Sequence, residues 1–144
     1  MSVNKQKLND DLMFGLKSEQ WIKHILSLKY GNIEKLDQYN HFDFKGDKIY
    51  IEVKTRRIYH DTYPSLMFSK KKLDAGLSNY MDTGEDIVFI WRCLDGLFYW
   101  DFIKGGVISD NYTIEISGRK DRGTIEEEEC VHIKTENISK FSIA

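Results

Sequence analysis

The sequence predicts a mixed α/β fold in which a central sheet is flanked by helices and extended by further strands near the C-terminus. Two segments with apolar residues at helical spacing alternate with short apolar runs that are separated by turn residues, and this alternation favours the α/β class. A chain of 144 residues can bury one core of its own, so we expect residues 1–144 to form a single domain.

The composition indicates a folded protein of the cell interior. Apolar residues make up 41% of the chain and aromatic residues 13%, which is too apolar for a disordered chain. No apolar run approaches the roughly 20 residues of a membrane helix, and the polar N-terminus does not resemble a secretory signal. Cys93 and Cys130 lack metal-type spacing, so we expect reduced thiols and a cytoplasmic location; a disulfide between them is the alternative.

The first predicted element is a helix over Leu16–Tyr30, which Gly31 ends. Its apolar residues recur at helical spacing: Ile22, Ile25, Leu26 and Leu28. Glu19 lies three residues before Ile22 and shares this stripe. A carboxylate on a buried stripe needs a partner or a metal-linked water, which makes Glu19 a candidate site residue. The alternative is a first-turn glutamate that interacts with the helix dipole.

A β-hairpin is predicted over Tyr39–Arg57, because two runs with period-two alternation flank the turn signal Gly46–Asp47. Pairing about this turn places two pairs on one apolar face, Phe44 opposite Ile49 and Phe42 opposite Ile51. We expect this face to pack on a core.

The other face of the hairpin is polar and carries a candidate metal site. Its members are His41, Asp43, Lys45, Tyr50, Glu52, Lys54 and Arg56. In this pairing Asp43 lies opposite Tyr50 and diagonal to Glu52, where Cβ atoms are roughly 7–8 Å apart. Two carboxylates at that distance can bind one divalent cation, and Lys54 stands on the same face as Glu52. The alternative is a surface strand with cross-strand ion pairs.

A short strand over Ser65–Phe68 and a second helix follow the hairpin. Ser69 caps this helix, which runs to Tyr80 or Asp82 with an apolar side made of Leu73, Leu77, Tyr80 and Met81. Lys70, Lys71 and Lys72 occupy its first turn, where cations oppose the helix dipole. Either the lysines are solvated, or they help the helix N-terminus to hold an anion.

Strands dominate the rest of the chain. The expected pieces are a second hairpin of Ile87–Cys93 and Leu97–Ile103, a strand over Val107–Ile116, a charged loop at Gly118–Gly123, the acidic run Glu126–Glu129 and a closing strand at Val131–Lys134. The nearly continuous apolar run Ile87–Trp91 predicts a strand in the middle of the sheet.

Positive charge gathers in the middle of an otherwise acidic chain. Residues Lys45–Lys72 contain eight Lys or Arg against three Asp or Glu, whereas the whole chain has a net charge of −2. A local anion-binding surface explains this distribution, and a solvated charged face is the alternative. The aromatic pair that we expect to face nucleic acid is Tyr59 and Tyr63, close to Arg56 and Arg57.

The hairpin residues suit phosphodiester hydrolysis, which needs an activated water and a stabilised phosphate. Mg²⁺ held by carboxylates serves both needs. Asp43 and Glu52 are the predicted ligands, with the Val53 carbonyl as a third oxygen; Glu19 would bind a second metal or a metal-linked water. Lys54 would orient or deprotonate the attacking water, and Lys72 with nearby basic residues would contact phosphate.

This constellation resembles the PD-(D/E)XK nuclease superfamily, whose pattern is a helix glutamate, an aspartate closing one strand and (Asp/Glu)-x-Lys on the next. The matching positions are Glu19, Asp43, Glu52 and Lys54, while Phe42 stands where the name pattern has proline. The predicted order over Leu16–Ile103 is similar to the restriction-endonuclease-like αβββαβ core of that superfamily.

More closely, the chain looks like small nuclease-like proteins of large DNA viruses. The matching pieces are Gly15–Glu19, Phe42–Phe44, Ile51–Arg56, Tyr63–Pro64, Lys72 and Gly118–Gly123. A viral protein of this kind would act inside the host cell.

The resemblance implies Mg²⁺- or Mn²⁺-dependent cleavage of DNA by an endonuclease or resolvase-type enzyme, with a homodimer if both strands are cut. The residues expected to contact DNA are Arg56, Arg57, Lys70, Lys72, Arg119 and Arg122. One alternative is a non-catalytic nucleic-acid-binding or assembly module on the same fold. Another is a protein-interaction module that uses the Gly118–Gly123 loop and the run Glu126–Glu129.

Overall fold

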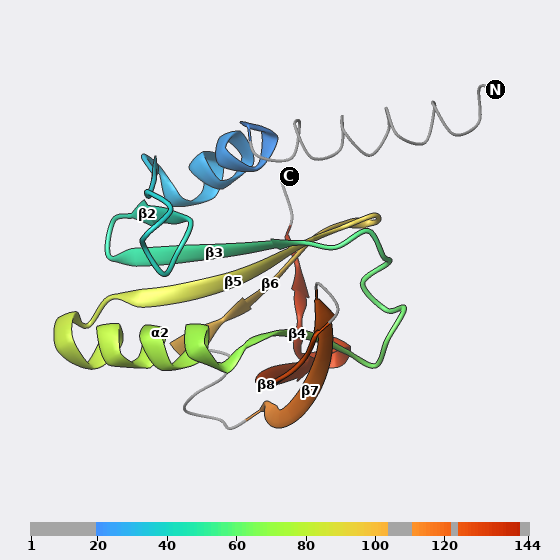
Figure 1. The fold of residues 1–144 in the computed structure, drawn as a ribbon. Helices are drawn as coiled ribbons and strands as arrows, with labels where there is room; N and C mark the ends of the chain where they lie inside the picture. Colours follow the sequence, from blue (N-terminus) through green and yellow to red (C-terminus); the bar gives the residue numbers. More distant parts are fainter. Residues whose placement is uncertain (1–19, 104–110, 122–123, 142–144) are drawn as a thin grey trace.

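The computed structural model describes residues 20–103, 111–121 and 124–141, without the side chains of residues 117–121 and 124–127. Two sheets organise this part of the chain (Figure 1). The larger sheet has six strands in the order β1-β2-β3-β5-β6-β9, and the smaller has three in the order β4-β8-β7. This arrangement confirms the mixed α/β class with a central mixed sheet and a C-terminal β extension.

The elements have the following bounds. The larger sheet contains β1 (Glu34–Lys35), β2 (Phe44–Gly46), β3 (Ile49–Thr55), β5 (Asp86–Cys93), β6 (Gly96–Asp101) and β9 (Ser139–Lys140). The smaller sheet contains β4 (Ser65–Ser69), β7 (Thr113–Asp121) and β8 (Thr124–Lys134). The helices are a first helix over residues 20–30, α2 (Lys70–Thr83) and the short 3-10 helix η2 (Thr135–Asn137).

Strands β3 and β5 form the parallel pair of the larger sheet, whose other described pairs are antiparallel. Parallel neighbours need a crossover connection. The chain therefore leaves β3 through residues 56–64, passes along β4 and α2, and returns as β5 (Figure 1). Nearly all of β5 is buried, which agrees with the apolar run Ile87–Trp91. The strand with the candidate site thus lies beside the most buried strand of the sheet.

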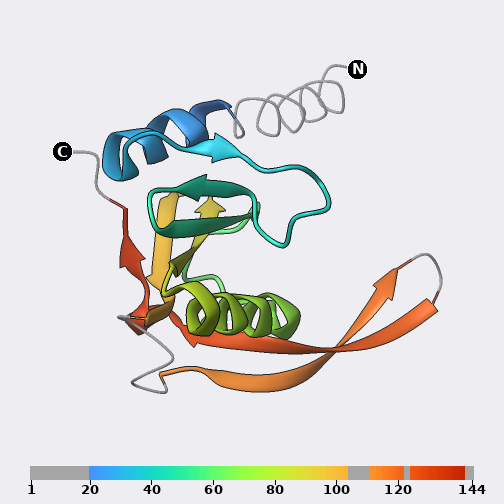
Figure 2. The same ribbon diagram turned by 90° about the vertical axis from the view of Figure 1, so that its left-hand side faces the viewer.

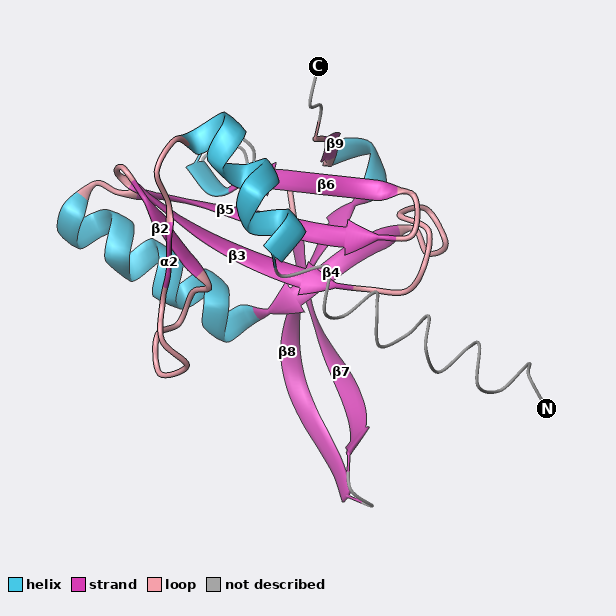
Figure 3. Ribbon diagram, turned by 90° about the horizontal axis from the view of Figure 1, so that it is seen from above, coloured by secondary structure: helices cyan, strands magenta, loops and turns pink. Residues whose placement is uncertain are grey.

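Both faces of the larger sheet are covered. Figures 1 and 3 show the first helix over one face, with α2 and the smaller sheet on the other. Ile22, Ile25 and Leu26 are buried against β2, β3 and β5, so the predicted stripe is confirmed. Leu28 is 63% exposed, contrary to the prediction, because the 3.6-residue period turns position 28 away from that stripe.

Helix α2 begins and ends as its sequence predicts. The Ser69 hydroxyl accepts the N–H of Lys71, and Gly84 ends the helix in the left-handed conformation. Gly76 faces β5 so closely that a Cβ there would lie 3.0 Å from Ile87 Cγ2. Met81 does not belong to the apolar side, contrary to the prediction, and is 77% exposed.

The predicted register of the first hairpin is wrong by two residues. The structure pairs Phe44 with Ile51 and Gly46 with Ile49, so Asp47 and Lys48 form the turn, with Lys48 at φ 57°. Gly46 suits this paired position because a Cβ there would lie 3.0 Å from Ile49 Cγ2. A shift of two residues keeps each side chain of β3 on its predicted face but changes its partner.

Phe42 is not on the same face as Phe44, contrary to the prediction. The Asn40 carboxamide oxygen accepts the N–H of Phe42 at 3.1 Å, a local turn that breaks the strand alternation before β2. Phe42 therefore packs with Tyr50, at 5.3 Å between ring centroids, on the side of the sheet that faces α2.

Strands β7 and β8 form a long hairpin that extends beyond the body of the molecule (Figure 2). Three predictions change here. Residues 107–110 of the strand expected over Val107–Ile116 lie outside the described residues, and β7 begins at Thr113. It continues to Asp121, so the described part of the expected Gly118–Gly123 loop is strand. The acidic run Glu126–Glu129 belongs to β8, which also contains the predicted closing strand. Cross-strand pairing extends both strands further than their local turn residues suggest.

Candidate active site

Two carboxylates meet at the beginning of the β2–β3 hairpin. Glu52 lies in β3 and is only 4% exposed, and Asp43 directly precedes β2. Asp43 Oδ2 accepts the N–H of Val53 at 2.8 Å, and Asp43 N–H donates to the carbonyl of Ile51 at 3.0 Å. Continuing the observed register puts Asp43 directly opposite Glu52, closer than the predicted diagonal position.

The electrostatics of Glu52 reflect this convergence. The pKa of Glu52 is raised to about 7, first by burial and then by the charge of Asp43 and a side-chain hydrogen bond with it, while Lys72 acts in the opposite direction. A carboxylate with so little exposure needs compensation. A divalent cation shared with Asp43 would provide it.

Lys72 reaches this pair from the first turn of α2. Its Nζ lies 3.2 Å from Glu52 Oε2 and also donates to the carbonyl of His41. The helix therefore carries a cation to the two acids, as the sequence reasoning expected of Lys72. The contact with the His41 backbone was not expected, because every residue has a backbone carbonyl and the sequence does not indicate which one a lysine will contact.

Lys54 stands two residues after Glu52 on the same face of β3 and is half-buried. Its Cα is paired with that of Trp91 in β5. Val53, between the two, gives its N–H to Asp43, and its side chain packs toward the first helix. The structure therefore gathers Asp43, Glu52, Lys72 and Lys54 around one segment of β3.

Two of the other predicted site residues, Glu19 and Arg122, lie outside the described residues. Lys70 pairs with Asp74 at 2.9 Å on the exposed side of α2. Arg56 and Arg57 are exposed directly after β3, and Arg119 lies in β7 with Glu126 as its register partner.

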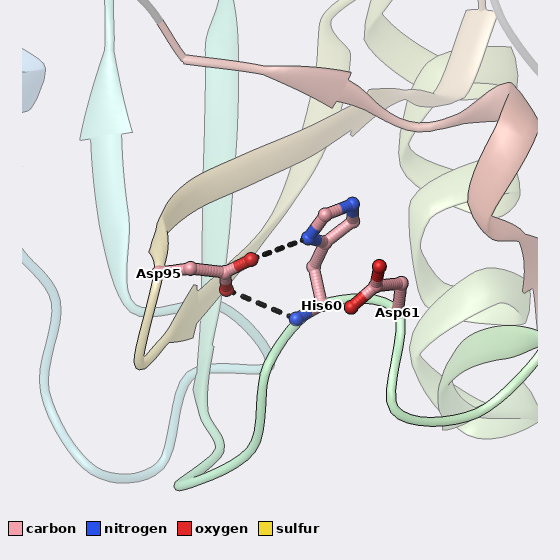
Figure 4. A group of neighbouring side chains, drawn as sticks. All are labelled: His60, Asp61 and Asp95. Atoms are coloured by element: carbon pink, nitrogen blue, oxygen red, sulfur yellow. Dashed lines mark hydrogen bonds and ion pairs between the residues drawn. The ribbon is translucent and has the colours of Figure 1, made fainter.

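One further cluster joins His60, Asp61 and Asp95, whose ligand-type atoms lie within 4.8 Å of one another (Figure 4). His60 Nδ1 lies 2.6 Å from Asp95 Oδ2, and the His60 N–H donates to Asp95 Oδ1 at 3.0 Å. The His60 ring also stacks on Phe98 at 4.1 Å between centroids. The sequence offers no spacing signal for this cluster, because the residues come from two separate loops.

The Asp43–Glu52 pair suits a hard divalent cation better than the His60 cluster. It presents carboxylate oxygens, the donors that Mg²⁺ and Mn²⁺ prefer. In the His60 cluster, both oxygens of Asp95 already hold His60, so the contact clamps the loop after β3 to the β5–β6 turn. Although burial alone raises the pKa of Asp95, the hydrogen bonds from His60 bring it below its ordinary value.

A mixed sheet in which neighbouring strands present an aspartate, a glutamate and a lysine has the architecture of the PD-(D/E)XK nuclease superfamily. The family model described as "Phage putative PDDEXK endonuclease" matches residues 15–142, and the chain belongs to that family. No curated protein and no solved structure matches the chain significantly. Among the described residues, no helix combines the length and the apolar character that crossing a membrane requires.

Proposed function

We propose that the protein is a divalent-metal-dependent nuclease that hydrolyses phosphodiester bonds in DNA. The observation that carries this proposal is the convergence of Asp43 and the buried Glu52, with Lys54 on the same face of β3. Membership of a family of PDDEXK endonucleases supports the same activity.

Each residue of the candidate site would have a separate role in the reaction. Asp43 and Glu52 would hold Mg²⁺ or Mn²⁺, with the Val53 carbonyl as a further oxygen and Glu19 as an additional ligand. The bound cation would act as a Lewis acid toward the scissile phosphate. Lys54 orients the attacking water through its ammonium group, and the Val53 N–H fixes the Asp43 carboxylate.

Positive charge on two sides of the acids would position the DNA backbone. Lys72 reaches the acids from α2, and Arg56 and Arg57 are exposed where β3 ends. A phosphate oxygen that enters this site would accept a hydrogen bond from the Lys72 ammonium group. Lys72 would then interact with both Glu52 and the substrate. The strand and the helix therefore enclose the phosphate between a carboxylate pair and a cation.

Cleavage assays with Mg²⁺ or Mn²⁺ on plasmid, linear duplex, single-stranded and branched DNA test the proposal. We expect the wild-type protein to cleave, and Lys54→Ala and Asp43→Asn proteins with unchanged circular dichroism to lose at least about 100-fold in rate. Lys71→Ala, an exposed lysine in the same region, is the matched control and should cleave normally. Undiminished cleavage by both site variants would contradict the assignment.

One observation favours a second candidate function, a non-catalytic DNA-binding module. The Lys72 ammonium already neutralises Glu52, so the fold does not need a metal to compensate that carboxylate. Binding of DNA without cleavage in every divalent metal, together with no Mn²⁺ bound by the wild-type protein, would identify this alternative.

A further inference from the structure

A groove of about 790 Å³ lies between the loop that follows β3 and the smaller sheet. We call it the Tyr63 groove. Its lining includes Arg56, Tyr63, Met67, Trp91, His132 and Lys134. The volume falls within the roughly 300–1,000 Å³ that small-molecule sites occupy. It is therefore large enough for a ligand of the size of a nucleotide.

One wall of the groove is a row of paired residues on the outer face of the smaller sheet. Met67 in β4 pairs with His132 in β8, which pairs with Thr113 in β7. Met67 is 39% exposed, although its strand neighbours Leu66 and Phe68 are buried. An apolar side chain thus faces the groove from a strand whose other face forms the core.

His132 adds a polar group to this wall. Its Nδ1 lies 3.0 Å from the Ser65 hydroxyl, which fixes the ring. Its Nε2 lies 3.3 Å from Glu115 Oε2 but has no aligned hydrogen bond with any described residue. The Nε2 atom is itself buried, so the imidazole contributes to the shape of this wall as a ring held between Ser65 and Glu115.

The opposite wall is the loop over residues 56–64, which is tied down along its length. Arg56 N–H donates to the carbonyl of Arg92 at 2.8 Å, and the His60–Asp95 clamp holds the middle of the loop (Figure 4). At the far end, the carbonyl of Pro64 accepts the N–H of Thr135 at 3.1 Å. Tyr63 is 60% exposed on this anchored wall.

The Tyr63 groove adjoins the candidate active site. Trp91 is fully buried beneath the groove, and its Nε1–H donates to the carbonyl of Met67 at 3.1 Å. Its Cα partner in the neighbouring strand is Lys54. Adjacent strands lie roughly 4.8 Å apart, so the floor of the groove begins one strand away from Lys54. Arg56 lies two residues after Lys54, just beyond the end of β3, and lines the groove directly.

We propose that the Tyr63 groove binds an unpaired nucleobase of the strand being cut, and that the substrate is therefore DNA with single-stranded nucleotides. This inference rests on the proposed nuclease function. Tyr63 and Met67 offer apolar surface for a base, while Arg56 and Lys134 at the groove supply positive charge for the flanking phosphates. A base inside a duplex stays stacked and paired, so only an unpaired or extruded base enters such a groove.

The test measures DNA binding in the Lys54→Ala background, where cleavage does not interfere. The probes are a single-stranded oligonucleotide containing 2-aminopurine, the same oligonucleotide in a duplex, and a forked duplex. We expect the single-stranded and forked probes to bind with a change in 2-aminopurine emission, and the duplex to bind more weakly without that change. Equal affinity for all three probes would overturn the inference.

Tyr63→Ala and Tyr59→Ala are matched variants for this test. Both tyrosines are exposed, at 60% and 58%, but only Tyr63 lines the groove. We expect Tyr63→Ala to weaken single-strand binding about tenfold while duplex affinity stays within about twofold, and Tyr63→Phe to restore binding. Tyr59→Ala removes an exposed aromatic ring outside the groove and should keep the change in 2-aminopurine emission that Tyr63→Ala loses. Equal losses in the two alanine variants would overturn the inference.

Salt dependence separates base contacts from phosphate contacts. Tyr63→Ala should leave the slope of log affinity against log salt unchanged, whereas Arg56→Ala should reduce its magnitude by about one. A reduced slope in Tyr63→Ala would contradict base binding by this residue.

The nuclease proposal can fail separately. Cleavage of duplex DNA that requires Lys54 but is unaffected by Tyr63→Ala would overturn the groove inference alone. Single-strand binding that requires Tyr63, with no cleavage by the wild-type protein, would overturn the nuclease proposal alone.

Discussion

Lys72 Nζ lies 3.2 Å from Glu52 Oε2, so a cation from helix α2 neutralises the most buried carboxylate of the candidate site. The same ammonium group donates to the His41 carbonyl, directly before the segment that carries Asp43. Lys72 thus joins the helix to both parts of the hairpin. A metal ion at the two acids and a phosphate at Lys72 would both change this contact.

Replacing Lys72 with alanine should separate metal binding from cleavage. Removal of a positive charge next to Glu52 reduces repulsion of a divalent cation, so we expect Mn²⁺ to bind about fivefold more tightly. DNA cleavage should become slower at the same time, because a phosphate contact is lost. Isothermal titration with Mn²⁺ and a cleavage assay measure the two effects. Lys71→Ala should change neither, and weaker Mn²⁺ binding by Lys72→Ala would contradict the prediction.

The stability of the metal-free protein should depend on pH through Glu52. Its pKa rises from the ordinary 4.5 to about 7 in the fold, so between these values the unfolded state binds fewer protons than the folded state. The contribution of Glu52 to the free energy of unfolding should therefore be fully present below about pH 4.5 and fall by about 3 kcal/mol as the pH rises through 7.

Glu52→Gln should remove this contribution, because the amide does not titrate. Urea unfolding at pH 5 and pH 8, with EDTA present, measures the difference between the two proteins. Asp86, whose pKa is raised to about 6 by burial and by a hydrogen bond with Asp101, contributes a slope of the same sign to both proteins. An identical fall in stability for wild-type protein and Glu52→Gln would contradict the prediction.

Two substitutions at Asp43 should separate its role in stability from its role in catalysis. Asparagine keeps an oxygen that can accept the Val53 N–H, so Asp43→Asn should unfold within about 1 kcal/mol of the wild type yet lose cleavage. Asp43→Ala removes the acceptor and should lose a further 1 to 2 kcal/mol or so. Thermal unfolding and cleavage rates measure both. Retained cleavage in the folded Asp43→Asn protein would exclude a role for the carboxylate charge.

The His60 cluster should act as a loop clamp and not as the metal site. His60→Ala removes the contacts with Asp95 and the stacking on Phe98, so we expect a loss of about 1 to 2 kcal/mol in stability with unchanged Mn²⁺ affinity. Glu52→Gln should show the reverse, a stable protein with weakened Mn²⁺ binding. Isothermal titration of both variants distinguishes the sites, and lost Mn²⁺ binding in His60→Ala would place the metal at the cluster.

The placement of the candidate side chains could be predicted from the sequence where strand alternation and helix capping determine it. Glu52 and Lys54 share a face because strand alternation does not depend on register, and Ser69 places Lys72 in the first turn of α2. The exact opposition of Asp43 and Glu52 was missed, since the turn uses Asp47 and Lys48 instead of Gly46 and Asp47. Local turn preferences do not reveal that Gly46 is needed for its close contact with Ile49.

Pairing between strands that are distant in the sequence explains the larger differences between the predicted and the observed structure. The extent of β7 and β8 follows from the pairing of β7 with β8 and of β8 with β4. The chain between β4 and β8 contains α2, β5, β6 and β7, so this pairing is far from local. Tyr63 was predicted to face nucleic acid from its aromatic character beside Arg56 and Arg57. Its groove was not predictable, because the opposite wall comes from Met67 and His132.

The parallel pairing of β3 with β5 has a consequence for the order in which the candidate site assembles. Glu52 acquires its neighbour Phe89 only after the intervening chain has been synthesised and folded into the crossover. Closing so long a loop is slow compared with forming the local hairpin. A nascent or truncated chain that ends before β5 therefore has the acids of the β2–β3 hairpin without the strand that packs beside Glu52. The candidate site is complete only after β5 has been synthesised and paired with β3.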